Sequence, residues 1–309
     1  MKILLCEFTL GKQHTFLPII LLFTCFIGHA QSANTISPSH VYQNTEKLVA
    51  EVNLLRNHKN KTELARTAGV QIKKTPLHVY GKCIEVVEKV IRLQEIAGTK
   101  KSVLPVIPMR AVKPAEVFAC TSTALEGLIA IKNKWNITEN ASEPPFVEGK
   151  TPSHVYRNMW QVSYLLDALV GQISPSNVFR NAQLVQEELK IIAKTQGLKL
   201  SGTTPASIDG KVPRDVLLQC FKGLTKLKKV ARQLGLKGIK VPKVPSGTKI
   251  LPSDVYDCTN MHLAELHSLK LHLNLTERSQ PVAVPSGKTP SDVYAQMVLI
   301  NEFLTQLKN

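Results

Sequence analysis

Three histidines and one glutamate occupy matching positions in the first half of the chain, each two residues after a proline. Four imidazole and carboxylate ligands of this kind are typical of a zinc site. If helices began at these prolines and started at one end of a bundle, the four side chains would come together around a metal ion. The candidate ligands are His40, His78, Glu116 and His154.

The competing interpretation is that each of these residues caps its own helix. The equivalent positions of the second half hold side chains that accept hydrogen bonds at helix starts. They are Asn177, Asp215, Asp254 and Asp292. Capping is the favoured interpretation, and the three histidines are the one feature that favours metal, because imidazole suits the positive end of a helix dipole less well than carboxylate does.

Aromatic side chains stand four residues after the same prolines in seven of eight copies. Gathered at one end of a bundle, such rings could line a pocket for a small anionic molecule. A stripe of this kind is more commonly core packing beneath the connectors, which is the alternative. The seven residues are Tyr42, Tyr80, Phe118, Tyr156, Phe179, Tyr256 and Tyr294.

The chain is basic, with a formal net charge of +16, and residues 222–249 contain no acid. Such a stretch suits an anionic partner, such as a cell-envelope polymer, a membrane surface or an acidic protein. An ordinary solvated face is the alternative. No nucleic acid partner is expected, because the sequence contains no recognisable nucleic-acid-binding motif. The candidate residues are Lys222, Lys226, Lys228, Lys229, Arg232, Lys237, Lys240 and Lys243.

Signatures of catalysis are absent from the sequence. It contains no G-x-S-x-G, H-E-x-x-H or C-x-x-C-H motif and no phosphate-binding glycine loop. We therefore expect a protein that is not an enzyme and that uses no cofactor.

One phrase recurs along the chain: GKTPSHVY at residues 149–156 returns as GKTPSDVY at residues 287–294, and six weaker copies accompany them. Neighbouring copies are 38 or 39 residues apart, except in the middle, where the spacing is 23. The copies form two groups of four that match member for member, which indicates a duplicated domain. Their prolines are Pro38, Pro76, Pro114, Pro152, Pro175, Pro213, Pro252 and Pro290.

Each copy has the features of a helix start, with proline at the first helical position. Apolar residues follow at 3, 7, 10, 14 and 17 residues after the proline, which is typical of a bundle helix. We predict an all-α fold of two tandem homologous four-helix bundles, built from eight repeats of a helix plus a long extended connector. His262 on the seventh helix falls on this apolar seam, where we expect a buried imidazole.

The connectors are long enough to return to the starting end of a bundle. A helix of about 20 residues is ~30 Å long, whereas about 15 extended residues reach ~50 Å, so the helices of a bundle can be parallel. The cysteines support this direction, because each proposed pair lies in the second turns of neighbouring helices. We predict the disulfides Cys83–Cys120 and Cys220–Cys258, with bonds between the halves or free buried thiols as alternatives.

The first thirty residues have the lysines, apolar run and small residues of a secretory signal, with cleavage expected after Ala30. An uncleaved membrane anchor is the alternative. The expected division is a signal peptide over residues 1–30 and four-helix domains over 31–172 and 173–309. We predict a periplasmic or secreted, non-catalytic binding protein, with a periplasmic sensor of a small ligand or metal as the second interpretation.

Overall fold

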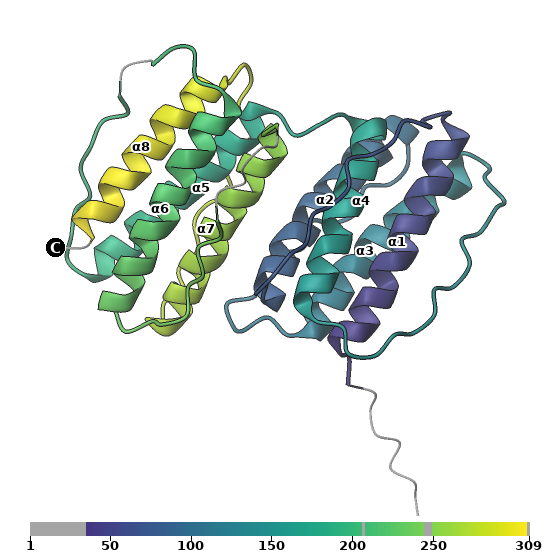
Figure 1. Ribbon diagram of the computed structural model, residues 1–309, viewed down its shortest axis with the longest axis horizontal. Coiled ribbons are helices and arrows are strands. Elements are labelled where there is room, and N and C mark those ends of the chain that lie inside the picture. The colour runs from purple at the N-terminus through teal and green to yellow at the C-terminus, as the bar shows by residue number, and fades with distance from the viewer. Residues whose placement is uncertain (1–34, 206–207, 244–248, 308–309) are drawn as a thin grey trace, which may run out of the picture. The chain divides into compact units, whose positions relative to one another are not determined.

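The computed structural model describes residues 35–205, 208–243 and 249–307, and these residues contain eight α-helices and no strand (Figure 1). The predicted signal peptide lies outside the described residues. The helices are α1 (Pro38–His58), α2 (Pro76–Ala97), α3 (Pro114–Lys134), α4 (Pro152–Val170), α5 (Pro175–Thr195), α6 (Pro213–Gln233), α7 (Pro252–His272) and α8 (Pro290–Gln306).

Every helix begins at one of the eight anchor prolines. The preceding residue is extended in each case, as an N-cap requires. Proline is suited to the first helical position because its fixed φ matches the helix and its missing N–H would have no intrahelical acceptor there. The recurring phrase is therefore a helix start in all eight copies.

The helices form two four-helix bundles with the same order around the axis. In the first bundle α1 and α2 each contact α3 and α4, and in the second α5 and α6 each contact α7 and α8. The two helices of each of the pairs α1–α2, α3–α4, α5–α6 and α7–α8 therefore lie diagonally opposite each other, whereas α2 and α3 are neighbours. Helix α3 is long and apolar enough to cross a membrane by composition, but it packs as a bundle helix against α1 and α2.

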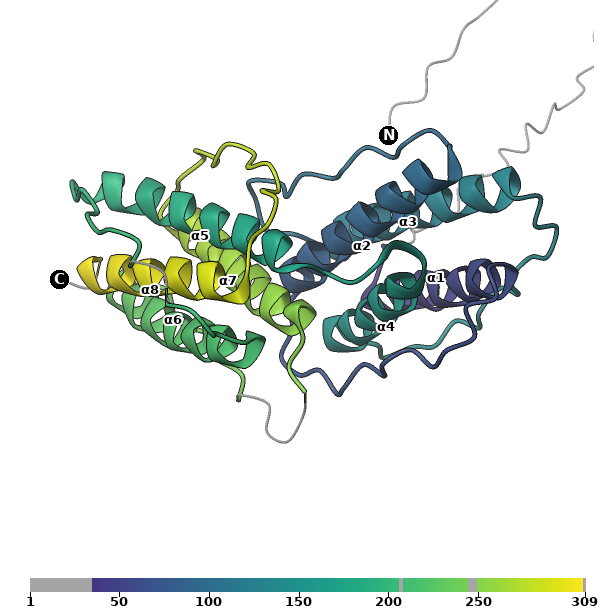
Figure 2. The ribbon, with the colours of Figure 1, turned by 90° about the horizontal axis from the view of Figure 1, so that it is seen from above.

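The four helices of each bundle are parallel, as predicted. Their first turns meet at one end, where the proline at the first position and the valine at the fourth position of each helix form a closed ring. The connectors run along the outside of the bundle from the end of one helix to the start of the next (Figures 1 and 2). In the first bundle the ring consists of Pro38, Val41, Pro76, Val79, Pro114, Val117, Pro152 and Val155.

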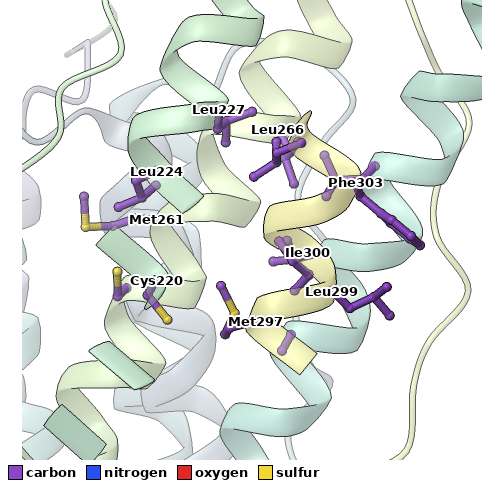
Figure 3. Close-up of a cluster of buried hydrophobic side chains, with 14 of the residues drawn as sticks. Cys220, Leu224, Leu227, Met261, Leu266, Met297, Leu299, Ile300 and Phe303 are labelled. Atoms are coloured by element: carbon purple, nitrogen blue, oxygen red, sulfur yellow. The ribbon is translucent and has the colours of Figure 1, made fainter. Parts of the chain in front are cut away.

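Apolar side chains fill the interior of each bundle, and Figure 3 shows the second, where leucines of α6 and α7 face Ile300 and Met297 of α8. His262 is fully buried there, as expected, and its Nδ1 lies 2.9 Å from the carbonyl oxygen of Cys258. Gly223 on α6 makes room for it, because a Cβ at that position would come within 2.7 Å of the imidazole Nε2. Gly223 has no side chain at a position of the apolar seam, and the buried imidazole of His262 fills that space.

The cysteines differ between the bundles. Cys83 and Cys120 form a disulfide with a Cα–Cα distance of 6.3 Å, which confirms the first predicted pair. Cys220 and Cys258 are buried thiols, so the second predicted disulfide is not formed in this structure. Burial and the neighbouring Cys220 raise the pKa of the Cys258 thiol well above its ordinary value, which keeps it protonated and unreactive.

Candidate functional site

The predicted metal ligands are helix caps. The Nδ1 atoms of His40, His78 and His154 each lie 3.1–3.2 Å from the backbone nitrogen of their own N-cap residue and accept its N–H. Glu116 accepts the N–H of Lys113 in the same way. The described residues contain no group of three or more histidine, cysteine or acidic side chains placed to hold a metal ion. Each of the four candidate ligands therefore turns back onto its own helix start, as the capping interpretation predicts.

The two closest copies of the phrase allow a test of this cap. Because carboxylate accepts from the N-cap N–H and also suits the helix dipole, His154→Asp should raise the free energy of unfolding by about 0.5–1 kcal/mol, and Asp292→His should lower it similarly. The cap N–H of Thr289 lowers the pKa of Asp292 below its ordinary value. The contribution of Asp292 is therefore fully present above about pH 4 and is lost as the pH falls through the lowered value.

Denaturant unfolding at pH 7 and in acid measures the change in the free energy of unfolding that each of the two substitutions causes. A destabilising His154→Asp at pH 7 would contradict the cap.

The lysine that precedes four of the eight helices also fixes that helix start to a neighbouring helix. The backbone N–H of Lys150 donates to the hydroxyl of Ser39 on α1 (3.1 Å), and its ammonium lies 4.3 Å from the ring centroid of Tyr42. We call this arrangement the lysine clasp. It recurs three times, as Lys74 on Ser153 and Tyr156, Lys211 on Ser291 and Tyr294, and Lys288 on Ser176 and Phe179.

The glycine of the phrase has a backbone role in the clasp. Gly149 and Gly287 have φ values of +73° and +70°, a conformation that residues with a Cβ rarely adopt. The turn that they make presents the next residue, the clasp lysine, to the neighbouring helix.

Five of the seven predicted aromatic residues pack against a lysine or a connector, whereas the Tyr256 hydroxyl accepts from Arg180 (2.8 Å). Four of the seven carry a clasp lysine on the ring, and Tyr80 donates its hydroxyl to the carbonyl oxygen of Val106 in a connector (3.1 Å). The bundle end between them is closed by the proline–valine ring, which leaves a hollow of about 10 Å³. A cavity of that size is too small for anything beyond a single water molecule.

A chain of buried charges joins α2 to α4. Lys82, Glu85 and Lys89 on α2 are each at most 1% exposed. Glu85 accepts from Lys82 (2.7 Å) and from Ser163 (2.6 Å), while Lys89 donates to Ser163 (2.7 Å) and Asp167 (2.5 Å). Burial opposes ionisation of Glu85, but the two ammonium groups outweigh it and lower the pKa of its carboxyl. Every charged group in this buried network has a partner within the first bundle, so the network serves to hold α2 against α4.

The same part of α2 holds the two bundles together through its contact with α7. The Tyr156 hydroxyl donates to Asp257, and burial together with that carboxylate raises the pKa of Tyr156 well above its ordinary value. Arg180 of α5 forms two hydrogen bonds with Glu88 of α2 (2.9 and 3.1 Å). The Tyr156–Asp257 hydrogen bond and the Arg180–Glu88 ion pair join the second bundle to the first.

A groove of about 340 Å³ opens between α2, α5 and α7. One wall is the α2 face that carries Gly81 and Ile84, and the other is the α7 face that carries Asn260, Leu263 and His267. The connectors 98–113 and 273–289 complete it with mainly apolar residues, among them Leu104, Pro105, Val106, Pro281 and Val282. Its volume and apolar lining are typical of a small-molecule site.

The predicted basic residues form an exposed surface on α6 and the connector after it. Lys222, Lys226 and Lys229 stand at i, i+4 and i+7, opposite the buried face of α6 that carries Leu224 and Leu227. Lys226 donates to the carbonyl oxygen of Asn301 (2.7 Å). Of the eight predicted residues, Lys222, Lys229, Arg232, Lys237, Lys240 and Lys243 are exposed, whereas Lys226 and Lys228 are partly buried.

Among the described residues, none of the eight forms an ion pair. The one carboxylate of α6, Asp215, caps its own helix start by accepting from Val212. Burial and the nearby ammonium of Lys222 lower the pKa of Lys226, while the carboxylate of Glu302 opposes the shift. The α6 surface is therefore a cluster of positive charge whose lysines and arginine form no ion pair among the described residues.

Comparison of the chain with protein-family models, with curated proteins and with solved structures found no match. Of the two features that remain as candidate sites, the sequence predicted the α6 surface and missed the groove. Apart from Tyr256, no groove residue was among the predicted site residues.

Proposed function

We propose that the protein is a non-catalytic, exported binding protein that holds a polyanionic partner on the α6 surface. The observation that carries this proposal is the absence of acidic residues between Asp215 and Asp254, a stretch that contains nine lysines and arginines. A cationic surface of this density attracts phosphate-rich surfaces and polymers.

The position of α6 in the fold supports the proposal. Its counterpart in the first bundle, α2, carries buried Lys82, Glu85 and Lys89 and packs against α7. At the equivalent positions α6 carries Gln219, Lys222 and Lys226, of which Lys222 is exposed, and α6 contacts no helix outside its own bundle in the described chain. The duplicated helix has thus kept its place in the bundle while its outer face is free for a partner.

Charge reversal on α6 tests the proposal. In the full mature chain, Lys222→Glu, Lys229→Glu and Arg232→Glu together should weaken binding to phosphatidylglycerol vesicles and to polyphosphate by about a hundredfold or more, since each cation near an anionic surface contributes about 1 kcal/mol. Wild-type binding should also fall steeply in about 0.5 M salt, because ions screen exposed charges.

The control is a variant with the same change in net charge on the first bundle, Lys61→Glu, Lys100→Glu and Lys134→Glu, whose lysines are also exposed. It should keep most of the binding. Equal losses in the two triple variants would show that net charge, and not the α6 surface, determines binding, and no binding by the wild type at low salt would refute the proposal.

A further inference from the structure

The groove between the bundles contains polar nitrogen atoms that have no partner. Arg180 Nε, Asn260 Nδ2 and His267 Nε2 are buried atoms that form no hydrogen bond. All three residues line the groove. A buried polar atom without a partner is costly, and native proteins leave few of them, so three along one groove call for a ligand.

Two of these nitrogens belong to one connected cluster. Arg180 donates to the Tyr256 hydroxyl (2.8 Å) through Nη2, and Asn181 donates to Asn260 Oδ1 (2.7 Å). The remaining donors, Arg180 Nε and Asn260 Nδ2, are therefore fixed in place by partners on their other atoms. Fixed neighbouring N–H groups suit a group with two acceptor oxygens.

His267 stands seven residues after Asn260, so it lies about 10 Å further along the same face of α7. It is 8% exposed. Burial and the neighbouring Lys270 lower the pKa of His267, so its imidazole is neutral at neutral pH. Backbone hydrogen bonds with Pro108 and Arg110 of the connector oppose this shift. The Nε2 atom, which has no partner, is the one left for a polar atom of a ligand.

The charged groups of the groove leave one positive charge unpaired. Its two carboxylates are already paired, Glu88 with Arg180 (2.9 Å) and Glu188 with Lys270 (2.5 Å). Arg278 also lines the groove and is exposed without an ion pair among the described residues. Apolar side chains beside it are open to solvent, with Leu104 39% and Val106 66% exposed.

We propose that this groove binds a small amphipathic carboxylate. The carboxylate accepts hydrogen bonds from Arg180 Nε and Asn260 Nδ2, the hydrocarbon body covers the apolar wall between Ile84 and Leu263, and His267 meets a polar atom further along. The α6 helix contributes nothing to this site. The proposal therefore goes beyond the polyanion function and fails or holds independently of it.

Calorimetric titration of the full mature chain with decanoate tests the site, with decyltrimethylammonium as the cationic probe of equal chain length. Decanoate should bind one to one and raise the melting temperature, and the cation should bind at least tenfold more weakly. Asn260→Leu and His267→Leu should each weaken decanoate binding about tenfold, the value of a lost hydrogen bond to a charged or fixed group. His272→Leu, on the same helix but outside the groove, is the matched control and should bind as the wild type does.

A second variant keeps the test decisive if the donor variants unfold. A Cβ at Gly81 would meet nothing within 4 Å, so Gly81→Leu fills the groove from α2 without a clash and improves helix propensity. It should stay folded and abolish decanoate binding. Binding unchanged in Gly81→Leu, equal affinity for the two probes, or no binding of decanoate at millimolar concentration would each overturn the proposal. Retention of a copurified peptide in place of decanoate would also overturn it.

Discussion

Glu85→Gln should lower the free energy of unfolding by about 3 kcal/mol or more, although glutamine has almost the same shape as glutamate. The substitution removes the negative charge between Lys82 and Lys89, which are 1% and 0% exposed. Breaking a buried ion pair by removing one partner leaves a charge without compensation and typically costs 3–5 kcal/mol. Urea or guanidinium unfolding of the full mature chain at pH 7 measures the loss.

The matched control is Glu95→Gln on the same helix. Glu95 pairs with Lys101 on the surface, where both side chains are about half exposed (48% and 59%), so its loss should cost less than ~1 kcal/mol. Because the folded-state pKa of Glu85 is lowered, its contribution is present above its ordinary pKa, about 4, and is lost as the pH falls through the lowered value. The difference between Glu85→Gln and the wild type should therefore shrink in acid. A penalty similar to that of Glu95→Gln would show that the buried chain contributes little.

Removing the disulfide of the first bundle is the second large effect. Cys83→Ala with Cys120→Ala should lower the free energy of unfolding by about 3–4 kcal/mol, because the bond closes a loop of nearly forty residues that otherwise gains entropy on unfolding. Thermal unfolding of the oxidised protein should show the loss, and reduction of the wild type should reproduce it.

The second bundle supplies the comparison, because Cys220 and Cys258 occupy the equivalent helix positions as thiols. Cys220→Ala with Cys258→Ala should cost only the packing of two sulfur atoms, ~1–2 kcal/mol. Peptide mapping without reduction should find the 83–120 link and two free thiols. A Cys220–Cys258 link would show that the second pair also oxidises, and a link between the bundles would contradict the parallel order of the helices.

The elements of this fold were predictable because their signals are local. Each helix start depends on a proline, an N-cap before it and an acceptor two residues after it, and all eight starts lie at the predicted prolines. The parallel direction followed from two numbers, the reach of the connectors and the position of Cys83 and Cys120 in the second turns of their helices. Neither inference required knowledge of which helices touch.

The contacts of the residues at the helix starts follow from helix geometry that the sequence already contained. The valine three residues after each proline lies on the apolar seam, and successive helical residues are rotated by about 100°. The residue before that valine, such as His154, therefore turns toward its own N-cap, whereas the residue after it, such as Tyr156, is buried and reaches Asp257 of the second bundle. Only the proline at the first helical position and the valine at the fourth lie in the proline–valine ring at the bundle end.

The lysine clasps and the groove could not be predicted, because they depend on the order of helices around each bundle and on the contact of α2 with α7. One sequence signal did mark the groove. Arg180, Asn260 and His267 stand where the matching positions of the first half hold Gln43, Ser122 and Ile129. Gln43 and Ser122 are also polar, so His267 is the one of the three that stands where the first half has an apolar residue.

The diagonal placement of the first two helices of each bundle has a consequence for folding during synthesis. Within the described residues α1 and α2 share no contact, nor do α5 and α6, so the first two helices of a bundle to leave the ribosome cannot shield each other from water. The third helix of the first half, α3, contacts both α1 and α2. Its synthesis therefore supplies the first helix–helix contacts of that bundle, and the disulfide links it to α2.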